Sequence, residues 1–114
     1  MLKHQPINVA LRLGVPVSLF PWADWKKVVD AFGWCCAYCG KERRKDLTMD
    51  HLDPVVKLGA RAAHVRGNIV PACRSCNSRK RDRPLEVFCA RYGYDPAAIR
   101  ARAAEPFRAG APAA

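Results

Sequence analysis

The sequence lacks any apolar run long enough to cross a bilayer. The apolar stretch near its start is broken by Arg12, Gly14 and Pro16, and no small-residue cleavage site follows Lys3. Internal repeats are also absent, which excludes a repeat array. We therefore expect a cytoplasmic protein that has no membrane partner.

Acidic residues are scarce relative to basic ones. The chain has 10 Asp and Glu against 20 Lys and Arg, for a formal net charge of +10. Between Lys41 and Arg83, twelve basic residues stand against five acidic ones. This surplus predicts a polyanionic partner, because Lys and Arg contacts to phosphate supply most of the sequence-independent affinity for nucleic acid. The charge alone also fits an anionic membrane surface or simple solubility.

The length of 114 residues suits one domain and is too short for two ordinary ones. A domain of this size buries a modest core, so cross-linking by a metal or by disulfides would stabilise it considerably. Six cysteines are present. Because no secretion signal is visible, a reducing compartment and metal binding explain them better than a disulfide framework.

Four of the cysteines form two C-x2-C pairs, Cys36 with Cys39 and Cys73 with Cys76, separated by 33 residues. Each pair predicts a tight knuckle with both thiolates on one side of a metal, and two knuckles complete the tetrahedral shell of structural zinc. Cys35 leaves an alternative first ligand, but the two-residue spacing of the second pair favours Cys36. The sixth cysteine, at position 89, is expected to be a small buried hydrophobe.

The chain divides into three expected segments. Residues 1–34 form an N-terminal extension with an amphipathic helix at about 21–32, residues 35–93 form the core, and residues 94–114 form a partly flexible tail rich in Ala, Arg and Pro. Apolar residues recur at helical spacing in the extension: Trp22, Trp25, Val28, Val29 and Phe32. We expect both tryptophans to be buried against the core rather than to stack on bases.

The core and tail contain short expected elements: strands at 47–51 and 68–70, and helices at about 74–81, 84–91 and 96–104. Pro71 should stop the second strand, and Gly93 should end the second of these helices. Residues 54–67 form a loop, and loops of this length inside compact domains are often functional.

A further pattern lies between and after the two knuckles: Met49-Asp50-His51-Leu52-Asp53-Pro54, then Asn68-Ile69-Val70-Pro71, then Asn77 directly after Cys76, with Lys80 three residues on. In its Asp-His-x-x-Pro element, its central asparagine and its Cys-x-x-Cys-Asn-x-x-Lys ending, the sequence resembles the HNH endonuclease family over about residues 35–83. It is similar to small phage or bacterial members of this family. Its Asp-His, Asn, Asn pattern is a variant, because the last position of the family motif is often histidine and here it is Asn77.

The resemblance implies a small α+β fold: a ββα-metal (His-Me finger) nuclease core with a structural four-cysteine zinc site and flanking helices. Asp50 and Asn77 would bind the catalytic divalent ion, Mg²⁺ or Mn²⁺, as hard oxygen ligands. His51 would activate water near neutral pH. Asn68 would brace the loop that orients His51. Lys80 would meet the phosphate, unless it belongs to a solvated helix face.

Three further polar residues have simpler interpretations. Asp53, directly before a proline, is expected to form a turn rather than to bind a metal. His4 and His64 match no motif and are expected on the surface.

The implied activity is metal-dependent hydrolysis of phosphodiester bonds in double-stranded DNA, leaving 5′-phosphate and 3′-hydroxyl ends. A single copy of the pattern predicts nicking of one strand at a time by a monomer, and the lack of a separate DNA-reading module predicts low sequence specificity. The resemblance also suggests a phage terminase or another DNA-processing protein as a partner. The alternative is a non-catalytic zinc-ribbon module that binds nucleic acid, which explains the cysteines and the charge but not the Asp-His and asparagine pattern.

Overall fold

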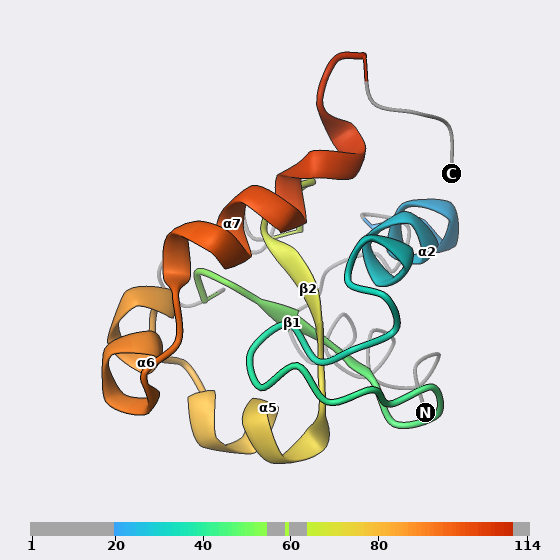
Figure 1. Ribbon diagram of the computed structural model, residues 1–114. Helices are drawn as coiled ribbons and strands as arrows, with labels where there is room; N and C mark the ends of the chain where they lie inside the picture. Colours follow the sequence, from blue (N-terminus) through green and yellow to red (C-terminus); the bar gives the residue numbers. More distant parts are fainter. Residues whose placement is uncertain (1–19, 55–58, 60–63, 111–114) are drawn as a thin grey trace.

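The computed structural model describes residues 20–54, 59 and 64–110, and it is a small α+β structure (Figure 1). Its elements are α2 (Trp22–Ala31), β1 (Thr48–His51), β2 (Ile69–Ala72), α5 (Arg74–Lys80), α6 (Leu85–Tyr92), α7 (Pro96–Ala104) and the 3-10 turn η2 (Glu105–Phe107). The order β1, β2, α5 confirms the expected fold class. Position 4 lies outside the described residues, as does the rest of the N-terminal extension before residue 20.

Helix α2 precedes the sheet in the chain and packs against it. It packs against β2 and α7, and its apolar repeat accounts for this, because Trp25, Val28 and Val29 are buried (Figure 1). The expectation that both tryptophans are buried is wrong for Trp22, which is 61 % exposed. Trp22 lies in the first turn of the helix, where its side chain falls outside the buried stripe.

The sheet is a two-stranded antiparallel ladder in which Thr48 pairs with Ala72 and His51 with Ile69. The expectation that Pro71 stops the second strand is wrong, because β2 continues through Pro71 to Ala72. In this register Pro71 faces Met49 in a pair that exchanges no hydrogen bonds, so its missing N–H is not needed by the ladder. The Pro71 carbonyl instead accepts a bond of 2.8 Å from the Ala37 amide.

Helix α5 follows β2 after a single residue, which places the second cysteine pair at the start of the helix. Cys73 is the N-cap and its sulfur accepts a hydrogen bond from the Cys76 amide. The helix packs against β1, on the side of the sheet away from α2 (Figure 1). The middle of α5 thus faces the start of β1, where Asn77 contacts Thr48, and the ends of the two elements meet at Lys80 and His51.

Helices α6 and α7 form the C-terminal part of the described chain. Gly93 ends α6 in the left-handed conformation at φ 77°, where a side chain would be strained. The helix expected at 96–104 is confirmed with those bounds, capped by the Asp95 carboxylate. Ile99 and Ala103 of α7 are buried, so this part of the tail packs on the core.

The buried core joins α2, the sheet, α5 and α6 in one hydrophobic cluster. Leu47, Leu52 and Ile69 are fully buried around the strands, and Cys89 is buried as expected. None of the helices within 20–54 and 64–110 is long and apolar enough to span a membrane.

Candidate functional site

The four paired cysteines meet at one point in the structure. The sulfurs of Cys36, Cys39, Cys73 and Cys76 all lie within 4.8 Å of one another. The Cys39 and Cys73 sulfurs are 3.9 Å apart, so the two knuckles face each other. Cys35 is not part of the group, because its thiol donates to the Gly33 carbonyl. The two-residue spacing thus identified the correct four sulfurs.

The chemistry of this cluster fits a zinc ion. Burial raises the pKa of the Cys36 thiol, mainly by desolvation, and it also raises the pKa of the Cys76 thiol. Keeping four adjacent sulfurs together as thiolates, three of them on buried residues, therefore requires a cation. Four thiolates around one centre are the donor set of structural Zn²⁺. The Arg79 guanidinium adds one donor, at 3.3 Å from the Cys76 sulfur.

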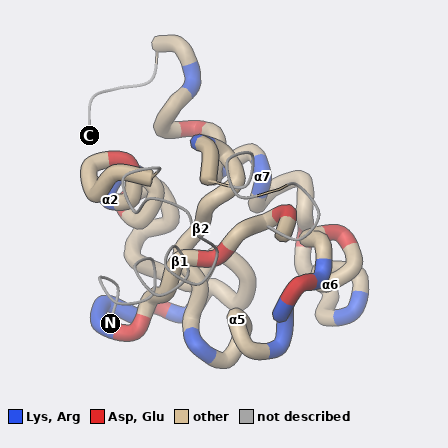
Figure 2. Tube along the Cα trace, turned by 180° about the vertical axis from the view of Figure 1, so that it is seen from behind, with Lys and Arg blue, Asp and Glu red and all other residues tan. Residues whose placement is uncertain are grey.

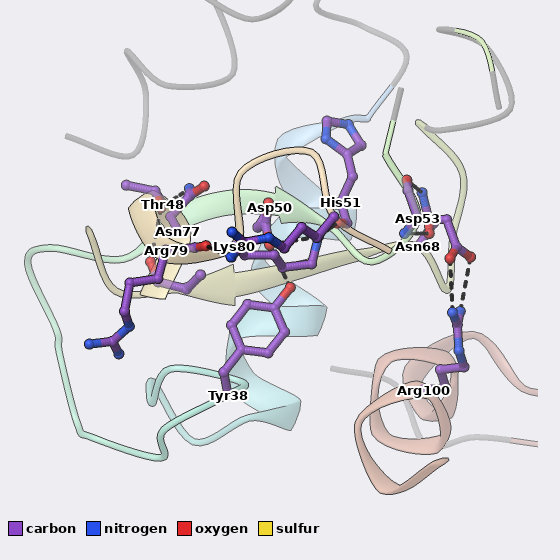
Figure 3. Close-up of polar contacts among 12 residues, drawn as sticks. Tyr38, Thr48, Asp50, His51, Asp53, Asn68, Asn77, Arg79, Lys80 and Arg100 are labelled. Carbon is purple, nitrogen blue, oxygen red and sulfur yellow. Dashed lines mark hydrogen bonds and ion pairs between the residues drawn. The ribbon is translucent and has the colours of Figure 1, made fainter. Parts of the chain in front are cut away.

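Asp50 lies in the interior at the centre of a polar network (Figure 3). Its Oδ2 accepts a hydrogen bond of 2.5 Å from the Tyr38 hydroxyl and lies 3.6 Å from the Lys80 ammonium. Burial raises the pKa of the Asp50 carboxyl, whereas the Lys80 charge and the Tyr38 hydroxyl lower it. Burial and the nearby carboxylate also hold the pKa of Tyr38 well above its ordinary value, which keeps the hydroxyl a donor.

Lys80 is fully buried rather than exposed on a helix face. The solvated-face interpretation is therefore wrong. Its ammonium donates to the His51 carbonyl over 2.6 Å in addition to pairing with Asp50 (Figure 3). A buried ammonium needs such partners because its desolvation is costly. Through these two buried contacts, Lys80 links the end of α5 to the end of β1.

Asn77 is held by a chain of hydrogen bonds to the sheet. Its amide nitrogen donates to the Thr48 hydroxyl over 2.7 Å, and that hydroxyl donates to the Ala72 carbonyl over 2.9 Å. Thr48 and Asp50 are two residues apart on β1 and so share one face of the strand. With its nitrogen committed to Thr48, the Asn77 side chain presents its carbonyl oxygen as the remaining polar atom (Figure 3).

His51 ends β1 and is partly buried. Desolvation lowers the pKa of His51 to about 3, with further contributions from His64 and Lys80. The imidazole is therefore neutral near pH 7, and one of its ring nitrogens carries a lone pair without a proton. The sequence-based expectation that His51 titrates near neutral pH assumed an exposed imidazole, because burial is not visible in the sequence.

His64 is buried rather than on the surface, which corrects the earlier expectation. Its Nε2 lies 3.3 Å from Nε2 of His51, and the two rings meet edge to face with centroids 4.6 Å apart. The segment after residue 63 returns to the end of β1, and this long-range approach leaves no local signal in the sequence.

Asn68 and Asp53 brace the turn that follows β1. The Asn68 amide accepts from the Asp53 N–H over 2.9 Å and donates to the Asp53 carbonyl over 3.1 Å. The Asp53 carboxylate forms two hydrogen bonds to Arg100 of α7, which also bonds Glu86 (Figure 3). Asp53 thus joins the turn to the C-terminal helix, a role beyond turn formation that the sequence did not reveal.

The structure brings most of the sequence-predicted residues together between the end of β1 and α5. Asp50, His51 and Lys80 contact one another directly, and Asn77 is joined to the same strand through Thr48. Asn68 contacts the next turn rather than this group. Tyr38, Thr48 and His64 were missed by sequence reasoning, although Tyr38 stands inside the first knuckle. Figure 2 shows that basic residues lie in separate places along the chain, with some on and just after α5.

The arrangement defines a small α+β domain with a metal-binding cysteine cluster and an Asp-His strand end packed on a helix. Residues 36–83 match the family model of the HNH endonucleases. The match begins at the first cysteine of the cluster and ends just after α5, so it contains both strands and both knuckles. This segment is therefore similar to an HNH endonuclease domain. No curated protein and no solved structure matches the chain.

Proposed function

We propose that the protein is a metal-dependent endonuclease that hydrolyses phosphodiester bonds in double-stranded DNA. The observation that carries the proposal is the meeting of Asp50 and His51 with α5 inside the HNH segment. A binding module alone gives no reason to bury a carboxylate beside a neutral imidazole at the end of a strand. The basic surplus supports a nucleic-acid substrate.

The donors that would hold the catalytic ion are Asp50 and Asn77. Oδ2 of Asp50 is engaged by Tyr38 and Lys80, which leaves Oδ1 as the oxygen for a cation. The Asn77 carbonyl oxygen is the matching donor, because its nitrogen is bound to Thr48. Oxygen donors of this kind suit Mg²⁺ or Mn²⁺ better than zinc. When bound, such an ion supplies positive charge to the phosphate and to the leaving oxygen.

His51 acts as the general base in this mechanism. Its neutral imidazole accepts a proton from the water that attacks phosphorus. The bond between phosphorus and the 3′ oxygen breaks, and the leaving oxygen takes a proton from solvent. Lys80 holds the backbone of His51 through the carbonyl, so it positions the base. The products are 5′-phosphate and 3′-hydroxyl ends. Asn68 supports the base indirectly by fixing the turn at Asp53.

We infer a monomer from the single copy of this pattern in the sequence. A monomer attacks one strand at a time, so nicks come before double-strand breaks. We also expect low sequence specificity. We assign residues 35–93 to the nuclease core and 1–34 to an N-terminal extension, with the part of the tail in α7 joined to the core through Arg100. A reducing compartment such as the cytoplasm keeps the zinc thiolates intact.

Cleavage of supercoiled plasmid with Mg²⁺ or Mn²⁺ tests the proposal. We expect open circles first, and we expect His51→Ala to lower the rate by roughly 10²–10⁴-fold, the usual worth of a general base. His4→Ala is the matched control, and it should cleave as the unmodified protein does. Equal cleavage by a folded, zinc-containing His51→Ala variant would remove His51 from the mechanism, and no cleavage by any form would refute the nuclease proposal.

A further inference from the structure

The pair formed by His51 and His64 has no part in the proposed chemistry beyond the role of His51 itself. The pair joins residues 13 positions apart, and its two Nε2 atoms lie 3.3 Å from each other. His64 is 9 % exposed, so the contact lies against the protein interior. Two imidazole nitrogens at this distance are either joined by a hydrogen bond or arranged to share an ion.

The separation matches that of two histidine ligands on one zinc ion. Zinc binds histidine nitrogen at about 2.0–2.1 Å, and two such ligands at the tetrahedral angle lie about 3.3–3.4 Å apart. The rings meet edge to face at 73° with centroids 4.6 Å apart, and binding one ion requires the side chains to rotate until both lone pairs point to it. Imidazole also suits zinc and related transition ions better than it suits Mg²⁺.

We propose that His51 and His64 form a second zinc site, separate from the four-cysteine cluster, whose occupation switches the nuclease off. Among the described residues, the four cysteines are the only group of three or more Cys, His, Asp and Glu donors arranged around one point. The histidine pair therefore supplies two ligands, and water completes the shell. A two-ligand site binds zinc more weakly than four thiolates, so it fills only after the structural site.

Inhibition follows from the chemistry of imidazole, and this step rests on the proposed role of His51 as the base. A neutral imidazole has a single lone-pair nitrogen. Once that lone pair is donated to zinc, His51 accepts no proton from water. Before binding, one Nε2 of the pair carries the shared hydrogen. That ring becomes a ligand when its proton leaves Nε2 and solvent protonates its Nδ1, so no net proton is released.

Zinc binding is measured on the unmodified full chain whose four-cysteine site already holds one zinc. We expect a second equivalent to bind on further addition, and the ring resonances of His51 and His64 to shift together in NMR spectra. His64→Gln should weaken the second site at least about tenfold, since even the loss of an outer-shell partner costs a metal site that much. His4→Gln is the matched control and should bind both equivalents.

Cleavage with Mg²⁺ supplies the second arm of the test. Each variant is compared with its own zinc-free rate, so a change in basal rate caused by His64→Gln does not matter. Zinc at the level that fills the second site should stop cleavage by the unmodified protein and by His4→Gln, and a chelator that spares the cysteine site should restore it. His64→Gln should resist this inhibition at least about tenfold better.

The two arms separate failure of this inference from failure of the nuclease proposal. Unchanged ring resonances of His51 and His64 on zinc addition would overturn the site even if Mg²⁺-dependent cleavage is robust. Equal zinc inhibition of His64→Gln and the control would overturn it as well. A second zinc bound by the pair in a protein that never cleaves DNA would uphold the site and refute the nuclease.

Discussion

Replacing Lys80 with methionine would show how much the buried pair with Asp50 contributes to the fold. Methionine keeps much of the length and apolar character of the lysine stem but removes the ammonium. In the structure that ammonium is fully buried, lies 2.6 Å from the His51 carbonyl and 3.6 Å from Oδ2 of Asp50. The variant therefore leaves a buried carboxylate without its countercharge.

The expected loss has an upper limit that can be calculated. The orphaned Asp50 avoids its charge by taking up a proton, and at pH 7 protonating a carboxyl with an ordinary pKa of 3.8 costs about 4 kcal/mol, from about 1.4 kcal/mol per pH unit. Breaking a buried ion pair from one side typically costs about 3–5 kcal/mol. We therefore expect Lys80→Met to lower the free energy of unfolding by about 3–4 kcal/mol at pH 7.

The pH dependence of this loss gives a sharper test. Burial already raises the pKa of Asp50 in the unmodified protein, and loss of the Lys80 charge raises it further. Between these two pKa values the folded variant binds a proton that neither the unfolded chain nor the unmodified folded protein holds. Lowering the pH then favours the folded state. The penalty of Lys80→Met should shrink by up to about 1.4 kcal/mol per unit as the pH falls from 7 towards 5.

Urea-induced unfolding at a fixed, buffered zinc concentration measures these quantities. Arg74→Met is the matched control, because Arg74 is an exposed residue in the first turn of the same helix. The control should change stability by no more than about 0.5 kcal/mol. A Lys80→Met variant as stable as this control, or one whose penalty does not change with pH, would refute the interpretation of Lys80 as a buried partner of Asp50.

Three further predictions concern the cysteine cluster, the basic surface and the bond between Thr48 and Asn77. Removing zinc from the four-cysteine site with a strong chelator should unfold the domain, which far-UV circular dichroism and thiol titration would detect, and a stable, folded, metal-free protein would contradict this. Arg81→Gln should reduce the slope of log K against log salt for duplex DNA by about 0.9, whereas Lys80→Met should leave it unchanged, because only Arg81 is exposed. Thr48→Val should cost about 1–3 kcal/mol, because the Asn77 amide loses its acceptor, and it should raise the Mg²⁺ concentration needed for cleavage; unchanged stability would show that this bond matters little.

Local signals in the sequence predicted the helices well. Pro96 after a capping Asp95 marks the start of α7, and the expected bounds agree with the structure. The prediction that Pro71 stops the second strand was wrong, because a strand tolerates proline at a position where the partner strand needs no N–H donor and excludes it where the donor is needed. That depends on the register with β1, and the register is set by long-range packing.

The candidate site shows the same division between local and long-range information. Cysteine spacing identified the four clustered sulfurs, because a knuckle is a local structure. From the sequence, Lys80 was expected to meet the phosphate or to lie on a solvated helix face, and its burial becomes evident only when β1 places Asp50 opposite it. The approach of His64 to His51 likewise depends on how a loop closes, which no short motif encodes.

The zinc cluster and the Asp50 network are parts of one arrangement. Tyr38, which donates to Asp50, stands between the two cysteines of the first knuckle. Lys80, the other partner of Asp50, lies on the helix that begins at the second knuckle. Both groups that hold the carboxylate are thus positioned by the sulfurs that zinc brings together. Because the network needs both knuckles in place, a weakened zinc site should disturb the proposed catalytic carboxylate before it unfolds the rest of the domain.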